Sequence, residues 1–305
     1  MLILHDAMCA DYGSSMRPEQ PARITRTADH LRTAQPGWLW RKPGFEVTDA
    51  TLLLAHTRPH LKRLALAHDF DADTPFFPGI ADHARRAVGA ALEAAQHALK
   101  TREPAFSLMR PPGHHATADS AMGFCYLNQI AVSALAAHHQ FGAARVAIWD
   151  FDAHHGNGTE AILHPHTLSG PTAGAFFFAS VHQHPGYPGT GTGDLGPRTR
   201  NWPLAPHTPR AAHMAALRAS FDAVLAFKPN LILVSAGFDA YAHDPLTAMT
   251  LEREDFATLG RWLADLRTSH AIPAAAILEG GYSDDLPLLV EAFLAAWDNS
   301  APNPA

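Results

Sequence analysis

Short segments of this sequence combine residue types that can hold a metal ion and activate water. Residues 149–158 (WDFDAHHGNG) follow an apolar run at 146–148 and place Asp150, Asp152 and His154 at alternate positions. If the chain stays extended there, these side chains point to one side, because successive residues of a strand face opposite ways. Carboxylates and an imidazole on one side predict a metal site.

Two further segments supply what a hydrolytic metal site needs. Residues 110–115 (RPPGHH) offer the paired imidazoles of His114 and His115, and residues 235–239 (SAGFD) end a second apolar run in Asp239. Catalytic zinc usually takes three protein ligands and leaves room for water and substrate, while a nearby imidazole can move the proton. Together the three segments predict a zinc hydrolase.

The apolar patterning predicts the elements that position these residues. Buried strands are expected at 105–109, 146–149, 175–181, 231–234 and 274–278, and helices at 80–100, 128–140, 209–227, 251–269 and 284–297. Strands separated by helices indicate an α/β fold: one domain with a central, mostly parallel sheet between two helical layers. Active sites of such sheets lie at the carboxyl ends of the strands, and each chemical segment directly follows a predicted strand.

The order of the segments resembles the histone deacetylase family, within the arginase-like and deacetylase-like metallohydrolases, and within it class II-like bacterial deacetylases. The matching segments are 18–23 (PEQPAR), 110–115, 123–128 (GFCYLN), 150–159 (DFDAHHGNGT), 188–191 (PGTG), 235–245 (SAGFDAYAHDP) and 279–282 (EGGY). The resemblance implies the family's fold and a catalytic domain over residues 1–298. Residues 299–305 lack apolar periodicity and are expected to form a frayed tail.

The resemblance also implies the metals. It makes Asp152, His154 and Asp239 the zinc ligands, although Fe(II) or Co(II) could use the same donors. It further implies a structural potassium ion, held through side-chain or backbone oxygens of Asp150, Asp152, His154, Ser180 and Val181.

The resemblance pairs His114 with Asp150 and His115 with Asn157. A charged partner raises the pKa of an imidazole more than a neutral amide does, so the two rings become chemically unequal. We therefore expect His115 to be the general base, which later protonates the leaving amine, with His114 as an electrostatic helper. Tyr282 is expected to donate its hydroxyl to the developing oxyanion.

The resemblance assigns the substrate pocket to Gly123, Phe124, Tyr187, Leu246 and Asp73, and places Arg23 near the acetate exit path. Flat apolar walls suit the four methylenes of an acyl-lysine side chain. Asp73 is expected to bind the substrate backbone, with a helix or turn cap as the alternative. Leu246 stands where polyamine-selective relatives carry Glu, which favours lysine-type substrates.

These observations predict hydrolysis of an acylated lysine, in a peptide or protein, or of a related acylated amine. The alternative is deacetylation of acetylated polyamines. An arginase-like binuclear hydrolase would need a second metal with further carboxylates, and a non-enzymatic reader of acyl-lysine would need neither the His pair nor Tyr282. The physiological substrate, the preferred acyl length and the oligomeric state stay open at this point.

The composition of the chain excludes several classes of protein and of binding partner. The chain has 305 residues, 47% hydrophobic and 17% charged, which is enough apolar material for a large core. Its formal charge of −6 argues against nucleic acid as a partner. Two cysteines are too few for a disulfide framework, and no apolar run is long enough for a signal peptide or a membrane span. We therefore expect a soluble, cytoplasmic protein with no membrane partner.

Overall fold

The computed structural model describes residues 1–298, and the predicted frayed tail at 299–305 lies outside them. Eight strands form one sheet in the order β2-β1-β3-β8-β7-β4-β5-β6. Their bounds are β1 Leu2–Leu4, β2 Leu39–Arg41, β3 Ala105–Ser107, β4 Val146–Asp150, β5 Phe176–Gln183, β6 Thr199–Leu204, β7 Leu231–Ala236 and β8 Ala274–Leu278. Every neighbouring pair is parallel, so the sheet is more regular than the mostly parallel one predicted.

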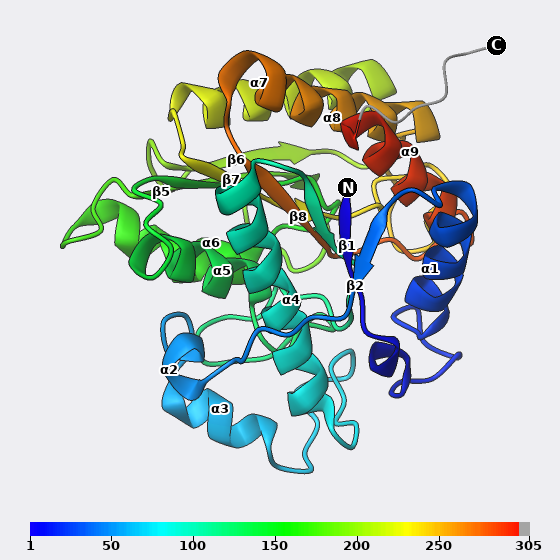
Figure 1. Cartoon of the computed structure of the whole chain (residues 1–305), viewed down its shortest axis with the longest axis vertical. Helices are drawn as coiled ribbons and strands as arrows, with labels where there is room; N and C mark the ends of the chain where they lie inside the picture. The colour runs from blue at the N-terminus through cyan, green and yellow to red at the C-terminus, as the bar shows by residue number, and fades with distance from the viewer. Residues whose placement is uncertain (299–305) are drawn as a thin grey trace.

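Helices cover both faces of this sheet (Figure 1). Helices α4 (Ile80–Thr101), α5 (Gln129–His139) and α6 (Asn157–Leu168) pack on one face. Helices α7 (Arg210–Ala226), α8 (Arg253–Asp265), α9 (Leu286–Asp298) and α1 (Ala22–Ala34) lie on the other. Two short helices, α2 (Asp49–Leu52) and α3 (Arg58–Leu64), precede α4. This is the predicted α/β architecture with three layers.

The central strands are buried on both faces, which explains their uninterrupted apolar sequences. All five residues of β4 are buried, and Trp149 reaches the α7 side, where its indole N–H donates to the Ser220 hydroxyl at 2.9 Å. Because side chains alternate along a strand, Asp150 points to the opposite face, toward α5 and α6. The carboxylate is thereby buried in the layer that contains the His pair.

Five strands and five helices were predicted close to their observed positions, and the other elements were missed. The missed strands β1 and β2 have three residues each, and β6 is an edge strand that contains Pro203. Such short or edge segments carry little hydrophobic periodicity. Helix α6 was also missed, because polar residues and Gly158 occupy its first turn and Pro165 lies within it.

Candidate active site

The four strands that precede the chemical segments are neighbours in the sheet, in the order β3-β8-β7-β4. Their parallel carboxyl ends therefore deliver these segments to one place. The segment after β3 is anchored by Arg110, which is fully buried and forms an ion pair with Glu19. The Arg110 guanidinium also lies 4.2 Å above the Tyr12 ring. This packing connects the 18–23 segment to the two histidines.

Three side chains form a group that could hold a metal ion. The ligand atoms of Asp152, His154 and Asp239 all lie within 4.8 Å of one another. His154 Nδ1 is 2.8 Å from Asp239 Oδ2 and 3.2 Å from Asp152 Oδ1. Both carboxylates are fully buried, so two negative charges and one imidazole face each other with little access to water. A dication suits this donor set, because it offsets the charge that burial would otherwise penalise.

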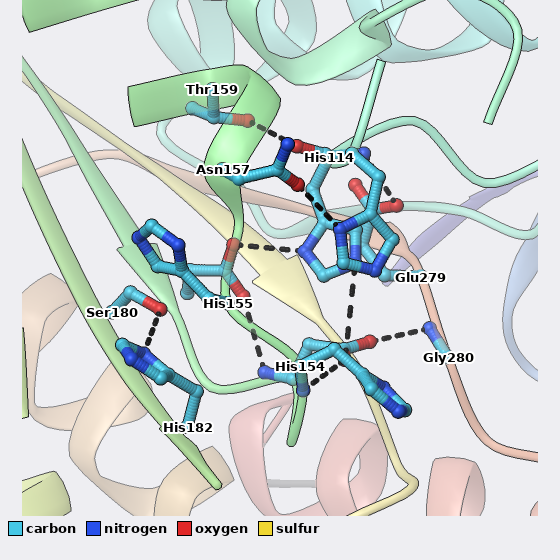
Figure 2. A network of polar contacts seen from close by, with 12 residues as sticks. His114, His154, His155, Asn157, Thr159, Ser180, His182, Glu279 and Gly280 are labelled. Carbon is cyan, nitrogen blue, oxygen red and sulfur yellow. Dashed lines mark hydrogen bonds and ion pairs between the residues drawn. The ribbon is translucent and has the colours of Figure 1, made fainter. Parts of the chain in front are cut away.

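Backbone amides orient the two carboxylates. The Gly280 N–H donates to Asp152 Oδ2 at 2.7 Å, and the Ala153 N–H donates to Asp239 Oδ1 at 2.8 Å. Figure 2 shows Gly280 reaching this network from the segment after β8. Asp152 Oδ1, which faces the His154 ring, also accepts the His154 backbone N–H at 2.8 Å, whereas Asp239 Oδ2 faces the ring without a backbone donor.

The extended conformation predicted from Asp150 to His154 is wrong. Strand β4 ends at Asp150, and the chain bends over residues 152–154. Asp150 turns away from the metal-ligand group, and its Oδ2 accepts from His114 Nδ1 at 3.1 Å. The bend, rather than strand alternation, brings Asp152 and His154 together with Asp239.

Glycines make the close approach of these segments possible. A Cβ on Gly237 would lie 2.1 Å from Asp152 Oδ2, and a Cβ on Gly280 would lie 2.1 Å from Asp239 Oδ2. Any side chain at either position would displace a carboxylate. The glycines of the 235–239 and 279–282 segments are therefore required by the carboxylates they touch.

The His pair has two different partners. His114 Nδ1 donates to Asp150, while His115 Nδ1 lies 2.8 Å from the Asn157 side-chain oxygen, which can only accept. The centroids of the two rings are 4.0 Å apart. His115 therefore carries its proton on Nδ1, which leaves its Nε2 free to accept a proton.

The two partners and the burial give the rings opposite charge states. Burial alone would lower the pKa of His114, but the carboxylates of Asp152 and Asp150 outweigh it and raise this pKa to about 10. Burial lowers the pKa of His115 well below its usual range, and the nearby imidazoles of His114 and His154 act in the same direction. At neutral pH His114 is a cation and His115 is a neutral base.

A pocket of about 250 Å³ opens beside these groups. It is lined by Arg17, Pro18, Asp73, His115, Gly123, Phe124, His154, Tyr187, Leu246 and Tyr282. The five predicted substrate residues all line it. Arg17 and Pro18 were not predicted as lining residues, although Pro18 belongs to the matching 18–23 segment. Leu246 and Tyr187 are 38% and 39% exposed, which places them at the mouth.

Tyr282 is held in the pocket wall by contacts to its backbone and to its ring. Its backbone N–H donates to Asp244 Oδ2 at 2.7 Å, and the Arg23 guanidinium lies 4.7 Å above its ring. Arg23 is buried, and its Nε donates to the Gly281 carbonyl at 2.7 Å. Asp244 also accepts from the Leu246 N–H at 2.9 Å. This carboxylate was missed as a site residue; the turn it stabilises joins Leu246 to Tyr282.

Glu279 is a second residue that the sequence reasoning did not single out. Its fully buried carboxylate accepts the Gly113 N–H at 2.7 Å and the His114 N–H at 3.1 Å (Figure 2). Burial raises the pKa of Glu279 to about 7, against the opposing effect of His114. The carboxylate connects the end of β8 to the backbone of the His pair.

Three of the predicted potassium ligands are neighbours in the sheet. Asp150 on β4 pairs with Ser180 on β5, and Val181 follows Ser180. The Ser180 hydroxyl lies 2.9 Å from His182 Nδ1, so this side chain already has one protein partner.

Asp73 is exposed, and its backbone N–H donates to the Asp71 carboxylate at 2.9 Å. Asp71, not Asp73, therefore caps this turn.

Comparison with known proteins assigns the family. The family model of the histone deacetylase domain matches residues 17–296. The chain belongs to the histone deacetylase family. It is accordingly an enzyme of the hydrolytic deacetylase class.

Several relatives are similar over most of their length. The chain is 41% identical to an uncharacterised protein of Synechocystis, with 87% of this chain and 88% of the relative covered. It is 36% identical to the histone deacetylase-like amidohydrolase of Pseudomonas aeruginosa, with 89% and 73% covered. An acetylpolyamine amidohydrolase of Mycoplana ramosa is 36% identical, with 69% and 61% covered.

Solved structures share the fold. The crystal structure of the HDA15 HD domain superposes with a TM-score of 0.87 at 29% identity, with 100% of this chain and 91% of that chain covered. An acetylpolyamine aminohydrolase from Burkholderia pseudomallei superposes with a TM-score of 0.83 at 24% identity, with 97% and 98% covered. The predicted family and fold are thereby confirmed. Every helix within residues 1–298 is too short or too polar to cross a membrane.

Proposed function

We propose that this enzyme hydrolyses Nε-acyl-lysine, most simply Nε-acetyl-lysine, with a zinc ion held by Asp152, His154 and Asp239. The observation that carries the proposal is that these three residues lie together and that one of them, His154, lines a pocket with His115 and Tyr282. When bound, zinc supplies a Lewis acid that polarises the amide carbonyl and acidifies water. The proton transfers and the stabilisation of the oxyanion are assigned to protein side chains.

His115 acts as the general base. Its neutral Nε2 takes a proton from the attacking water, while Nδ1 remains bonded to Asn157. The same Nε2–H then protonates the leaving amine. His114 stays cationic beside Asp150 and stabilises the negative charge that develops on the substrate. The Tyr282 hydroxyl donates to the oxyanion.

The pocket walls suit the methylenes of a lysine side chain. Phe124 and Tyr187 contribute aromatic surfaces, and Gly123 contributes a wall without a side chain. A structural potassium ion is proposed at the oxygens of Asp150, Asp152, His154, Ser180 and Val181. This hard cation would offset the charge of the buried carboxylates.

The zinc assignment is tested by Asp152→Ala, His154→Ala and Asp239→Ala. Each variant should lose zinc and activity together, because a three-ligand site has no spare donor. Zinc is measured by mass spectrometry of the purified protein, and folding by circular dichroism. Stoichiometric zinc with wild-type turnover in any of the three would refute the ligand set. Two manganese ions per chain would instead indicate an arginase-like centre.

Deacetylation of acetylated polyamines is the second candidate. It is favoured by the relatives named acetylpolyamine amidohydrolase. Against it stands Leu246 at the mouth, because an apolar side chain offers a distant ammonium no compensation for lost hydration. Leu246→Glu should move the ratio of kcat/KM values toward N-acetylputrescine severalfold, an effect that salt reduces. An unchanged ratio would remove Leu246 as a reason to prefer lysine substrates.

A further inference from the structure

The mouth of the pocket carries two opposite charges. Arg17 is the one cationic Lys or Arg side chain and Asp73 the one carboxylate among the ten described lining residues. Asp73 is exposed and Arg17 half-buried, whereas His115 and His154 at the other end are shielded from solvent. An acyl group that reaches the His pair would therefore leave the α-carbon of a lysine substrate near Arg17 and Asp73.

Arg17 is held in place but keeps most of its donors. Its Nη1 donates to the Ala72 carbonyl at 3.1 Å, which fixes the guanidinium next to the loop that carries Asp73. Within residues 1–298, no carboxylate lies close enough to form an ion pair with it. A guanidinium has five N–H donors, so one hydrogen bond leaves the others for a ligand.

We propose that Arg17 recognises a carboxylate attached to the α-carbon of the acylated substrate. This inference rests on the proposed function and specifies its substrate class: free Nε-acyl-lysine, or acyl-lysine as the last residue of a peptide. A carboxylate matches the planar fork of the guanidinium, while Asp73 accepts from the α-amino or amide N–H. The two charges of the mouth complement the two polar groups on the α-carbon.

The same charges separate this substrate class from polyamines. Acetylated polyamines carry ammonium groups and no carboxylate, so Asp73 would attract them while Arg17 would repel them. An internal acyl-lysine of a protein has neither α-charge and would leave Arg17 without a partner at the mouth. Arg17 is therefore the feature that favours a substrate with a free carboxylate over both alternatives.

The test compares four substrates on the zinc-loaded enzyme: Nε-acetyl-L-lysine, its α-amide, a peptide ending in Nε-acetyl-lysine and N-acetylputrescine. The wild-type enzyme should prefer the free acid over the α-amide severalfold in kcat/KM, because an ion pair at an exposed mouth is typically worth up to about 1 kcal/mol. Arg17→Gln should bring this ratio close to one, and Arg17→Lys should retain part of it. Arg261→Gln on α8, an exposed arginine that lines no part of the pocket, should leave the ratio unchanged.

The outcomes are distinct. Equal rates for acid and amide in the wild type, or an equal loss for both in Arg17→Gln, would overturn the role of Arg17. The proposed function would survive that result, because acyl-lysine would still be hydrolysed. Hydrolysis of N-acetylputrescine with neither acyl-lysine form accepted would instead overturn the proposed function. If the peptide ending in acetyl-lysine matches the free amino acid, the carboxylate alone is recognised; if it is slower, the α-ammonium contributes too.

Discussion

Asn157→Asp tests whether His115 is the general base. Asn157 accepts from His115 Nδ1 at 2.8 Å, and aspartate can accept the same hydrogen bond with a negative charge added. Asn157 begins α6, and helix N-termini favour acidic residues, so folding should be preserved. The substitution therefore changes the electrostatics of one imidazole and little else.

The size of the effect follows from the distance. Two unit charges about 4 Å apart interact by about 4 kcal/mol at an effective dielectric constant of about 20, which would raise a pKa by at most about three. Neighbouring opposite charges typically raise an imidazole pKa by about one to three. A general base works only when unprotonated, so activity disappears as the pH falls through its pKa. In the wild type this pKa lies well below its usual range, so the variant should lose activity about one to three pH units higher.

The assay is kcat with an acetyl-lysine peptide as a function of pH, from the lowest pH at which the enzyme stays folded and keeps its zinc up to pH 10. Zinc content and circular dichroism are measured at each pH. Asn230→Asp is the matched control, because it makes the same substitution at an exposed residue. The Asn230 side-chain oxygen accepts a backbone N–H, that of Arg145, and no imidazole. If the acidic limbs of Asn157→Asp and the wild type coincide while both remain folded and loaded, His115 is not the base.

Three other perturbations have defined outcomes. Gly123→Ala would place a Cβ 2.7 Å from the His115 ring and 2.9 Å from the Tyr187 ring, at a φ of +56°. The value of kcat/KM should fall more than tenfold. An unaltered value would contradict the role of Gly123 in the pocket wall. Burial lowers the pKa of His56 to about 3, and its Nε2 accepts the Asn128 N–H at 2.9 Å. Its contribution to stability is therefore complete above pH 6.5 and is lost as the pH falls, by about 2 kcal/mol at pH 5; His56→Gln should flatten this dependence in urea unfolding. Glu279→Ala leaves two amides without their acceptor and should cost about 1–3 kcal/mol in unfolding free energy with a lower kcat, whereas Glu279→Gln should retain most of both.

The family resemblance named Asp152, His154 and Asp239 as zinc ligands, and the structure brings these three side chains together in a group that could hold a metal ion. Asp152, His154 and Asp239 follow apolar runs that read as buried strands, and the carboxyl ends of parallel strands meet at one edge. The extended conformation from Asp150 to His154, from which the first indication of a metal site was drawn, is wrong, but the order of the sequence segments led to the same residues. A bend after Asp150, rather than an extended strand, brings Asp152 and His154 together.

The residues that the sequence reasoning missed act through backbone contacts. Asp244 and Glu279 accept N–H groups from segments 38 residues or more away in the chain. Neither has a spacing pattern that reveals such a partner, because the partner exists only after the strands are in register. Arg17 is similar, since its position at the pocket mouth depends on the loop that carries Ala72.

The sequence by itself determined the fold class, the family and the residue types available for chemistry, because burial imposes apolar runs and catalysis demands particular side chains. The resemblance named the partners of the two histidines, but only the tertiary structure supplied the distances and the burial that set their charge states. His114 and His115 are neighbours in the chain, yet one is held as a cation and the other as a neutral base. Their difference comes from Asp150 and Asn157, and from burial in a layer where charges are screened weakly. Electrostatics of this kind depends on distances between segments, and those distances are set by the packing of the sheet and its helices.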